Sequence, residues 1–89
     1  MTGFYELKFV KSFDKELRKI DHKLIPWIVK KILELEKNPR TNQTKKLKGT
    51  KNEYRLRVGD YRVFYTIDDK KRLVIIYYIA HRGEIYRKK

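Results

Sequence analysis

The stretch Glu53–Thr66, EYRLRVGDYRVFYT, decides the fold that we expect of this chain. Its side chains alternate with a period of two on both sides of Gly59-Asp60, which is typical of two antiparallel strands joined by a two-residue turn. A turn of this length also sets the register, because Val58 must then pair with Tyr61 and the remaining residues follow in step. The sequence therefore predicts a β-hairpin that turns at Gly59-Asp60.

This register divides the side chains of the hairpin between two faces. The first face is apolar and carries Tyr54, Leu56, Val58, Tyr61, Val63 and Tyr65. The second, which we call the arginine face, carries Arg55, Arg57 and Arg62 together with Phe64. Arg57 should lie opposite Arg62, and like charges directly opposite destabilise a sheet. We expect no acidic side chain within the strands on this face, so the pattern predicts a surface that binds an anion.

Length and charge bound the class of protein. The 89 residues suit one domain with a modest core, which we place over residues 1–89. Twenty-four Lys and Arg residues against 11 Asp and Glu residues give a formal net charge of +13. An excess of this size favours a nucleic acid or a nucleoprotein as the partner over a merely basic surface.

Other sequence features exclude several kinds of site. There is no cysteine, so neither a disulfide nor a thiolate metal site can form, which fits a cytoplasmic location. The longest apolar run, Leu73–Ala80, has the length of a buried strand and not the roughly 18 residues of a membrane span. His22 and His81 lack the companions of a metal site. We expect no metal, no cofactor, no signal peptide and no membrane partner.

Segments before the hairpin predict a strand and two helices. Residues 4–10 alternate as a short strand, and Ser12 is a candidate N-cap for a first helix. Asp21 is a candidate cap for a second helix, whose apolar stripe ends before Asn38-Pro39. We interpret Trp27 in that stripe as a core residue, with a contact to a partner as the alternative. Residues 40–52 are expected to form a polar loop.

The segment after the hairpin completes an α+β fold. Leu73–Ala80 is apolar on both faces, which is typical of a central strand. We expect an N-terminal strand, a two-helix hairpin and then a three-stranded antiparallel meander, forming one sheet with the helices packed on one face.

The same topology predicts the candidate site. The last strand should return beside Arg62, which would bring His81 and Arg82 to the edge of the arginine face, with Tyr86 just beyond. Arginine binds phosphate through bidentate, charge-assisted hydrogen bonds. Further basic residues either form an ordinary solvated surface or extend this site toward RNA: Lys45, Lys46, Lys48, Lys51 and Arg87.

Clustered cations can also catalyse. When a ribose 2′-OH attacks the adjacent phosphate, negative charge grows on the phosphoryl oxygens, and fixed arginines stabilise that charge. The reaction also needs a proton acceptor and a proton donor. His81 and Tyr86 are the titratable candidates in the predicted cluster.

Three motifs resemble the RelE/ParE toxin superfamily over nearly the whole chain: KLKG at 46–49, YRLRVGDYRVFY at 54–65 and IAHRGEIYR at 79–87. The resemblance to the RelE branch implies an endonuclease that cuts mRNA codons in the ribosomal A site and is silenced by a co-expressed antitoxin. It also implies catalytic roles for the residues at the matching positions, which are Arg55, Arg57, Arg62, Arg82 and Tyr86. His81 stands where relatives have histidine or a basic residue.

One departure from the RelE pattern concerns proton transfer. The best-known RelE pattern has lysines at the positions of Arg55 and Arg57, and arginine hardly deprotonates. If those lysines transfer protons in relatives, that role would either pass to His81 or Tyr86 in this chain or leave its activity weaker.

The resulting expectation is a toxin of a type II toxin–antitoxin system. It would be a metal-independent endoribonuclease that cleaves ribosome-bound mRNA and inhibits translation, with an antitoxin, mRNA and the ribosome as partners. The alternatives are a ParE-like inhibitor of DNA gyrase and a basic module that binds RNA or the ribosome without cutting. The combined arginine, histidine and tyrosine set favours the ribonuclease.

Overall fold

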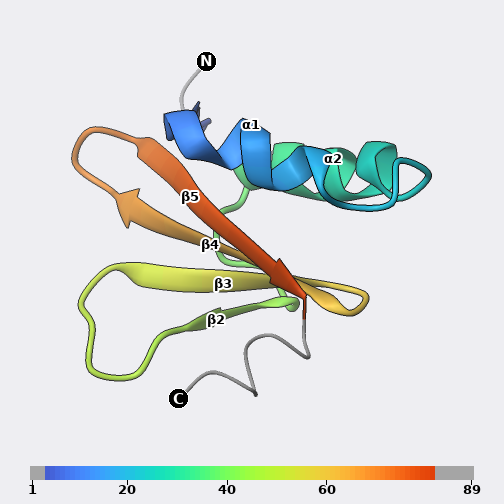
Figure 1. The fold of residues 1–89 in the computed structure, drawn as a ribbon. Helices are drawn as coiled ribbons and strands as arrows, with labels where there is room; N and C mark the ends of the chain where they lie inside the picture. Colours follow the sequence, from blue (N-terminus) through green and yellow to red (C-terminus); the bar gives the residue numbers. More distant parts are fainter. Residues whose placement is uncertain (1–3, 82–89) are drawn as a thin grey trace.

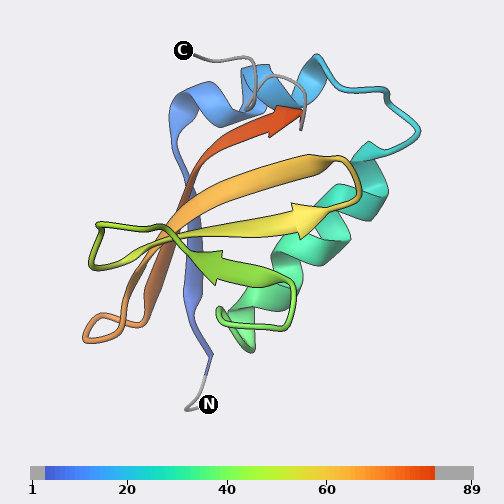
Figure 2. The same ribbon diagram turned by 90° about the horizontal axis from the view of Figure 1, so that it is seen from below.

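Five strands form one mixed sheet in the order β1-β5-β4-β3-β2 in the computed structural model, which describes residues 4–81 (Figures 1 and 2). Both helices lie on one face of this sheet (Figure 1), as the sequence predicts for an α+β fold. The elements in chain order are β1 Glu6–Phe9, α1 Lys11–Arg18, α2 Ile25–Leu33, the 3-10 helix η1 Glu34–Glu36, β2 Thr44–Lys46, β3 Glu53–Val58, β4 Tyr61–Asp68 and β5 Leu73–His81.

The predicted hairpin is confirmed in its register. Strands β3 and β4 pair with Val58 opposite Tyr61 and Arg57 opposite Arg62. Gly59 has a φ of +61°, a left-handed conformation that glycine adopts without steric cost. A Cβ atom at this position would also lie 2.8 Å from Cη2 of Trp27, which packs over the turn from α2. The positive φ and the contact with Trp27 are two independent reasons that favour glycine in this turn.

The meander contains one strand more than predicted. Strand β2 pairs antiparallel with β3, with Lys45 opposite Arg55, so the expectation of an unbroken polar loop over 40–52 is wrong. These three residues lack alternating apolar side chains, and their extended form depends on pairing with β3. At the other edge, β1 pairs in parallel with β5, with Glu6 opposite Leu73.

A β-bulge interrupts the pairing of β4 with β5. Tyr65 lies opposite Ile76 while Phe64 lies opposite Tyr78, which leaves Tyr77 as the extra residue in β5. An extra residue exchanges the two faces for every side chain that follows it. After the bulge, Ile79 and His81 therefore lie on the apolar face with Val63 and Tyr61, and Ala80 lies on the arginine face with Arg62. Strict alternation along β5 would have placed them the other way round.

Neither helix begins at its predicted cap. The N-cap positions are Val10 for α1 and Leu24 for α2, and neither side chain makes a capping hydrogen bond. Asp21 instead accepts a hydrogen bond from the backbone N–H of Lys23 at 3.0 Å, which closes a turn between the helices. Neither helix within residues 4–81 is both long and apolar enough to cross a membrane.

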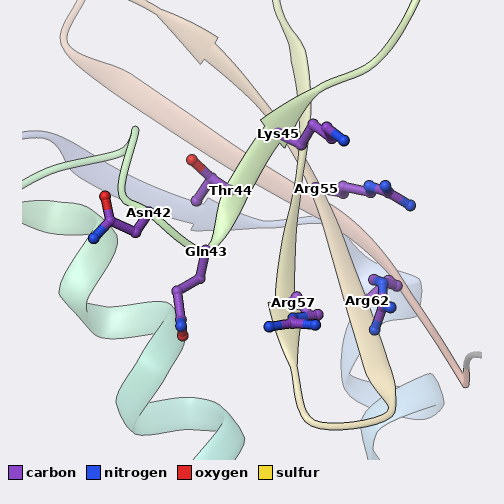
Figure 3. Close-up of a pocket in the computed structure, with 7 residues that line it drawn as sticks. All are labelled: Asn42, Gln43, Thr44, Lys45, Arg55, Arg57 and Arg62. Carbon is purple, nitrogen blue, oxygen red and sulfur yellow. The ribbon is translucent and has the colours of Figure 1, made fainter.

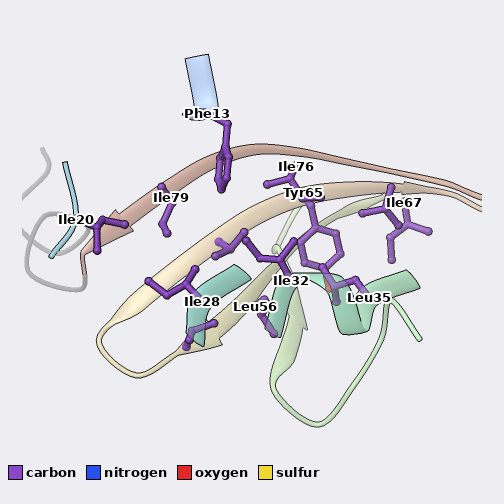
Figure 4. Close-up of a cluster of buried hydrophobic side chains, with 13 residues drawn as sticks. Phe13, Ile20, Ile28, Ile32, Leu35, Leu56, Tyr65, Ile67, Ile76 and Ile79 are labelled. Carbon is purple, nitrogen blue, oxygen red and sulfur yellow. The ribbon is translucent and has the colours of Figure 1, made fainter. Parts of the chain in front are cut away.

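The core fills the space between the helices and the apolar face of the sheet (Figure 4). The hairpin contributes Leu56, Val58, Val63 and Tyr65, which confirms the predicted apolar face. Tyr65 is fully buried, and its hydroxyl donates a 2.6 Å hydrogen bond to the carbonyl of Pro39. The other buried members are Phe13, Ile20, Ile28, Ile32, Leu35, Ile67, Val74, Ile76 and Ile79.

A polar cluster ties four segments together on the surface. Arg40 donates to both carboxylate oxygens of Asp69, at 3.2 and 2.8 Å, and its Nε donates to the hydroxyl of Tyr54 at 3.1 Å. The hydroxyl of Tyr5 donates to Asp69 at 2.6 Å. The hydrogen bonds from Arg40 and then from Tyr5 lower the pKa of Asp69 to about 2. The cluster joins the start of the chain to β3 and to the turn between β4 and β5.

Candidate functional site

The sheet face away from the helices carries a basic pocket of about 270 Å³ (Figure 3). Two like-charged pairs meet there, because Arg57 lies opposite Arg62 and Lys45 lies opposite Arg55. Repulsion within such pairs lowers the stability of the folded sheet. The full lining consists of Asn42, Gln43, Thr44, Lys45, Arg55, Arg57 and Arg62.

Arg62 is held by the turn of its own hairpin. Its Nη1 donates to the carbonyl of Gly59 at 3.2 Å and to the carbonyl of Tyr61 at 3.1 Å. These two bonds orient the guanidinium group of Arg62 relative to the turn. An oriented arginine loses less conformational freedom when it binds an anion.

Arg57 is anchored through the main chain. Its backbone N–H donates to the carbonyl of Gln43 at 2.9 Å, and the N–H of Gln43 donates to Oγ1 of Thr41 at 3.1 Å. These bonds place residues 42–45 beside β3, where Lys45 joins the arginine face. The sequence predicted Lys45 as part of the basic surface but missed the polar side chains of Asn42, Gln43 and Thr44. They carry no pattern of their own and enter the site only because β2 pairs with β3.

Two acidic residues within the hairpin strands do lie on the arginine face, contrary to expectation: Glu53 in β3 and Asp68 in β4. Glu53 precedes Arg55 by two residues and therefore shares its face. Its Oε1 accepts a 2.9 Å hydrogen bond from the hydroxyl of Tyr77, the residue at the bulge. Burial of Tyr77, and then this bond, raises the pKa of that tyrosine to about 12. Glu53 is thus hydrogen-bonded to Tyr77 at the start of β3, whereas Arg57 lies near the other end of that strand.

His81 does not lie on the arginine face, so this part of the predicted site is wrong. Its partner in the sheet is Tyr61, whose side chain belongs to the apolar face. The bulge at Tyr77 is the physical reason, because it exchanges the faces along the last part of β5. His81 instead lines a small pocket with Glu16 and Lys19 of the α1 region.

The remaining predicted residues divide into three groups. Lys46 pairs with Tyr54 and so lies on the face opposite to Arg55. Lys48 and Lys51 are exposed in the connection between β2 and β3, at the end of β3 away from Gly59. The third group lies outside the residues that the structure describes and consists of Arg82, Tyr86 and Arg87.

The site therefore gathers positive charge and hydrogen-bond donors from β2, β3 and β4. Among residues 4–81, no three His, Cys, Asp or Glu side chains come together in a group that could hold a metal ion. Convergent guanidinium groups on a rigid sheet suit a phosphate or another anion with several oxygens.

Comparison with known families gives one match over most of the chain. Residues 7–86 match the profile described as ParE toxin of type II toxin-antitoxin system, parDE. Two proteins of Methanocaldococcus jannaschii, RelE4 and RelE1, both assigned as toxins, are 31% and 33% identical to this chain. The two alignments cover 96% and 91% of this chain, and 94% and 98% of the relatives.

Solved structures show the same fold. RelE in the RelE–RelB complex of Pyrococcus horikoshii superposes with a TM-score of 0.79 at 29% identity, covering 90% of this chain and 97% of the other. The isolated RelE toxin of E. coli gives a TM-score of 0.75 at 28% identity, covering 94% and 93%. With family profile, sequence relatives and structures in agreement, the chain belongs to the RelE/ParE superfamily and is a RelE-family toxin of a type II toxin–antitoxin system.

Proposed function

We propose that this toxin is a metal-independent endoribonuclease that cleaves ribosome-bound mRNA and thereby stops translation. The observation that carries the proposal is the like-charged pair formed by Arg57 and Arg62, directly opposite each other in one pocket with Arg55 and Lys45. A phosphate bound between these side chains would relieve their repulsion and accept bidentate hydrogen bonds. The fold would thus be most stable with the anion in place.

The same charges serve the chemistry. Attack of the ribose 2′-OH on the neighbouring phosphate forms a bond from O2′ to phosphorus and breaks the bond to O5′. Negative charge grows on the non-bridging oxygens in the transition state. The sheet fixes the backbones of Arg55, Arg57 and Arg62, and hydrogen bonds orient the side chain of Arg62, so these cations would stabilise that charge with limited reorganisation. Arg82 and Arg87 would add to this charge from the C-terminal segment.

Proton transfer is assigned to Tyr86 in this proposal. The proton of the 2′-OH must leave, and the departing 5′ oxygen must receive one. Arginine is a poor proton carrier at neutral pH, and His81 lies on the helix-bearing face of the sheet. Tyr86 follows β5 closely in sequence and is the remaining titratable candidate.

A cognate antitoxin is the second part of the proposal. The complexes from Pyrococcus horikoshii and Methanococcus jannaschii are both toxin–antitoxin assemblies of RelE with RelB. A chain with net charge +13 and an exposed arginine pocket would bind cellular RNA unless masked. We expect a short, acidic or amphipathic partner encoded next to this gene. Action on translating ribosomes would place the complex in the cytoplasm.

Inhibition of DNA gyrase is the second candidate, because the matching family profile is described as a ParE toxin. Primer extension on mRNA after induction separates the two functions. The proposal expects cuts at codons in the ribosomal A site, and loss of those cuts with Arg62→Gln. Lys48→Gln removes the same charge outside the pocket and should cut like wild type. Intact mRNA with double-strand DNA breaks would instead identify a gyrase inhibitor, and intact mRNA on stalled ribosomes a non-catalytic binder.

A further inference from the structure

A second pocket, of about 320 Å³, adjoins the basic pocket around the edge of β3. Both pockets are lined by Gln43, Arg57 and Arg62, so these three residues form a shared wall. The second pocket adds Trp27 and Lys31 from α2 and the Gly59-Asp60 turn. A ligand that binds the arginines can therefore continue from one pocket into the other.

Trp27 is the residue in this pocket whose position calls for an explanation. Trp27 is 43% exposed, although its neighbours Ile28 and Ile32 on α2 are buried. The turn accommodates the indole ring through Gly59, since any side chain there would meet the ring. A large aromatic ring is thus held against a tight turn, next to two arginines, with nearly half its surface in solvent. It does not have the environment of the core residue that the sequence suggested.

Gln43 stands between the two pockets. Its carbonyl accepts from Arg57 and its N–H donates to Thr41, so its backbone is fixed on both sides. Its side chain projects from the start of β2 toward α2 (Figure 3). A carboxamide offers a donor and an acceptor side by side, the arrangement that pairs with adenine, which presents an acceptor and a donor on one edge.

We propose that the second pocket is a nucleotide subsite, in which Trp27 stacks on a base and Gln43 hydrogen-bonds to its edge. The phosphate attached to that nucleotide would lie between Arg57 and Arg62. This inference rests on the proposed function, because it takes RNA as the ligand and adds the residues that choose the base beside the cut. Single-stranded RNA is commonly read in this way, by stacking on aromatic rings and by hydrogen bonds to base edges.

The charge of the pocket favours RNA over a peptide. Lys31, Arg57 and Arg62 line the pocket with three cations, of which Lys31 also lies 3.9 Å from a carboxylate oxygen of Glu34, and Asp60 adds one carboxylate. The pocket is also continuous with the arginine face, where an apolar peptide would have to bury charge without a partner. RNA alternates phosphates with bases, and the pocket offers Arg57 and Arg62 for a phosphate beside Trp27 for a base.

Trp27 is the single tryptophan of the 89 residues, so its fluorescence reports on this pocket alone. The toxin is titrated to saturation with 2′-O-methyl triadenylate, which cannot be cleaved by 2′-OH attack, and calorimetry records binding in parallel. The matched probe has the same backbone with abasic positions. We expect the triadenylate to quench the emission of Trp27 and the abasic probe to leave it nearly unchanged. Equal responses to both probes, or a triadenylate that does not bind, would overturn the subsite.

Variants separate stacking from packing. Trp27→Phe keeps an aromatic face and should bind triadenylate nearly as wild type does. Trp27→Leu keeps apolar volume over Gly59 but should bind roughly fivefold more weakly, the low end of the effect of losing one stacked base. If Trp27→Leu binds as tightly as Trp27→Phe, stacking is excluded. Gln43→Ala should reduce the preference for triadenylate over triuridylate.

Failure of this inference is distinguishable from failure of the proposed function. If mRNA is cut in cells while Trp27 does not respond to triadenylate, the subsite is wrong and the ribonuclease stands. If Trp27 responds while mRNA stays intact, the subsite stands as a binding site and the proposed cleavage is wrong. If the emission of Trp27 changes with the co-expressed antitoxin and not with triadenylate, the pocket is a protein interface.

Discussion

Tyr61 and His81 face each other across β4 and β5, with ring centroids 5.2 Å apart and ring planes at 86°. This edge-to-face contact lies on the sheet face that carries the helices. Arg62, one residue along β4, points to the opposite face. The sheet thus separates His81 from Arg55, Arg57 and Arg62, although Arg62 lies on the strand next to that of His81.

The first prediction concerns this separation. Loss of a general acid or base usually lowers a rate by about 10²–10⁴-fold. We expect His81→Gln to lower the cleavage rate by much less than this, because the side chain of His81 faces the α1 region. Tyr86→Phe should lower the cleavage rate by about 10²–10⁴-fold. Single-turnover cleavage of ribosome-bound mRNA measures both, and a His81→Gln variant as impaired as Tyr86→Phe would return the histidine to the catalytic set.

The second prediction is a gain of stability at the expense of activity. Arg57→Gln removes one member of the pair with Arg62, so we expect the free energy of unfolding to rise by about 0.5 kcal/mol. Lys51→Gln lowers the net charge equally but removes no such pair, so it is the matched control. Urea unfolding at low and high salt measures both, since the gain should shrink as salt screens the repulsion.

The same Arg57→Gln variant should cleave mRNA about 10²–10³-fold more slowly, the usual effect of losing one fixed donor to a developing oxyanion. Stability and activity would then change in opposite directions at one residue. A variant that is less stable than wild type at low salt would show that the pair is not repulsive in the folded chain.

The third prediction concerns acid unfolding through Asp69. Arg40 and Tyr5 lower the pKa of Asp69 from 3.8 to about 2. A carboxyl whose pKa is lower in the folded chain stabilises the fold fully above about pH 4, and this contribution is lost as the pH falls toward 2. The urea midpoint of wild type should therefore drop over this window. Asp69→Asn should lower the midpoint at pH 7 and flatten the drop, and Tyr5→Phe should do so partly.

The fourth prediction tests the two reasons for glycine in the hairpin turn. Gly49 and Gly59 both have positive φ, but a Cβ atom at Gly49 meets nothing within 4 Å. Gly49→Ala should thus cost only the backbone strain, about 1 kcal/mol. Gly59→Ala should cost more and should also shift the emission of Trp27. In a double-mutant cycle, Trp27→Leu should reduce the cost of Gly59→Ala, and additive effects would exclude the contact.

Local pattern was sufficient for the hairpin. The period of two identified the strands, and the Gly59-Asp60 turn determined the register through its length. The same argument correctly placed Arg55, Arg57 and Arg62 on one face. Each of these inferences depends on residues that are near in sequence, where chain geometry leaves few alternatives.

The pairing of strands that are distant in the sequence could not be predicted from local alternation. Residues 44–46 have no apolar alternation, so their strand appears only when Lys45 meets Arg55 and Gln43 meets Arg57. The parallel position of β1 beside β5 likewise depends on how the intervening helices cover the sheet. Such pairings are selected by the packing of the whole domain.

The sequence alone determined that this protein presents a cluster of arginines on a hairpin, because register and side-chain alternation are local. Only the tertiary structure decided which side chains accompany them. The bulge at Tyr77 turned His81 away, and the pairing of β2 brought Lys45 and Gln43 in. An extra residue in a strand moves every later side chain to the other face of the sheet. The position of that extra residue depends on packing against the neighbouring strand and the helices, so no single segment of the sequence determines it.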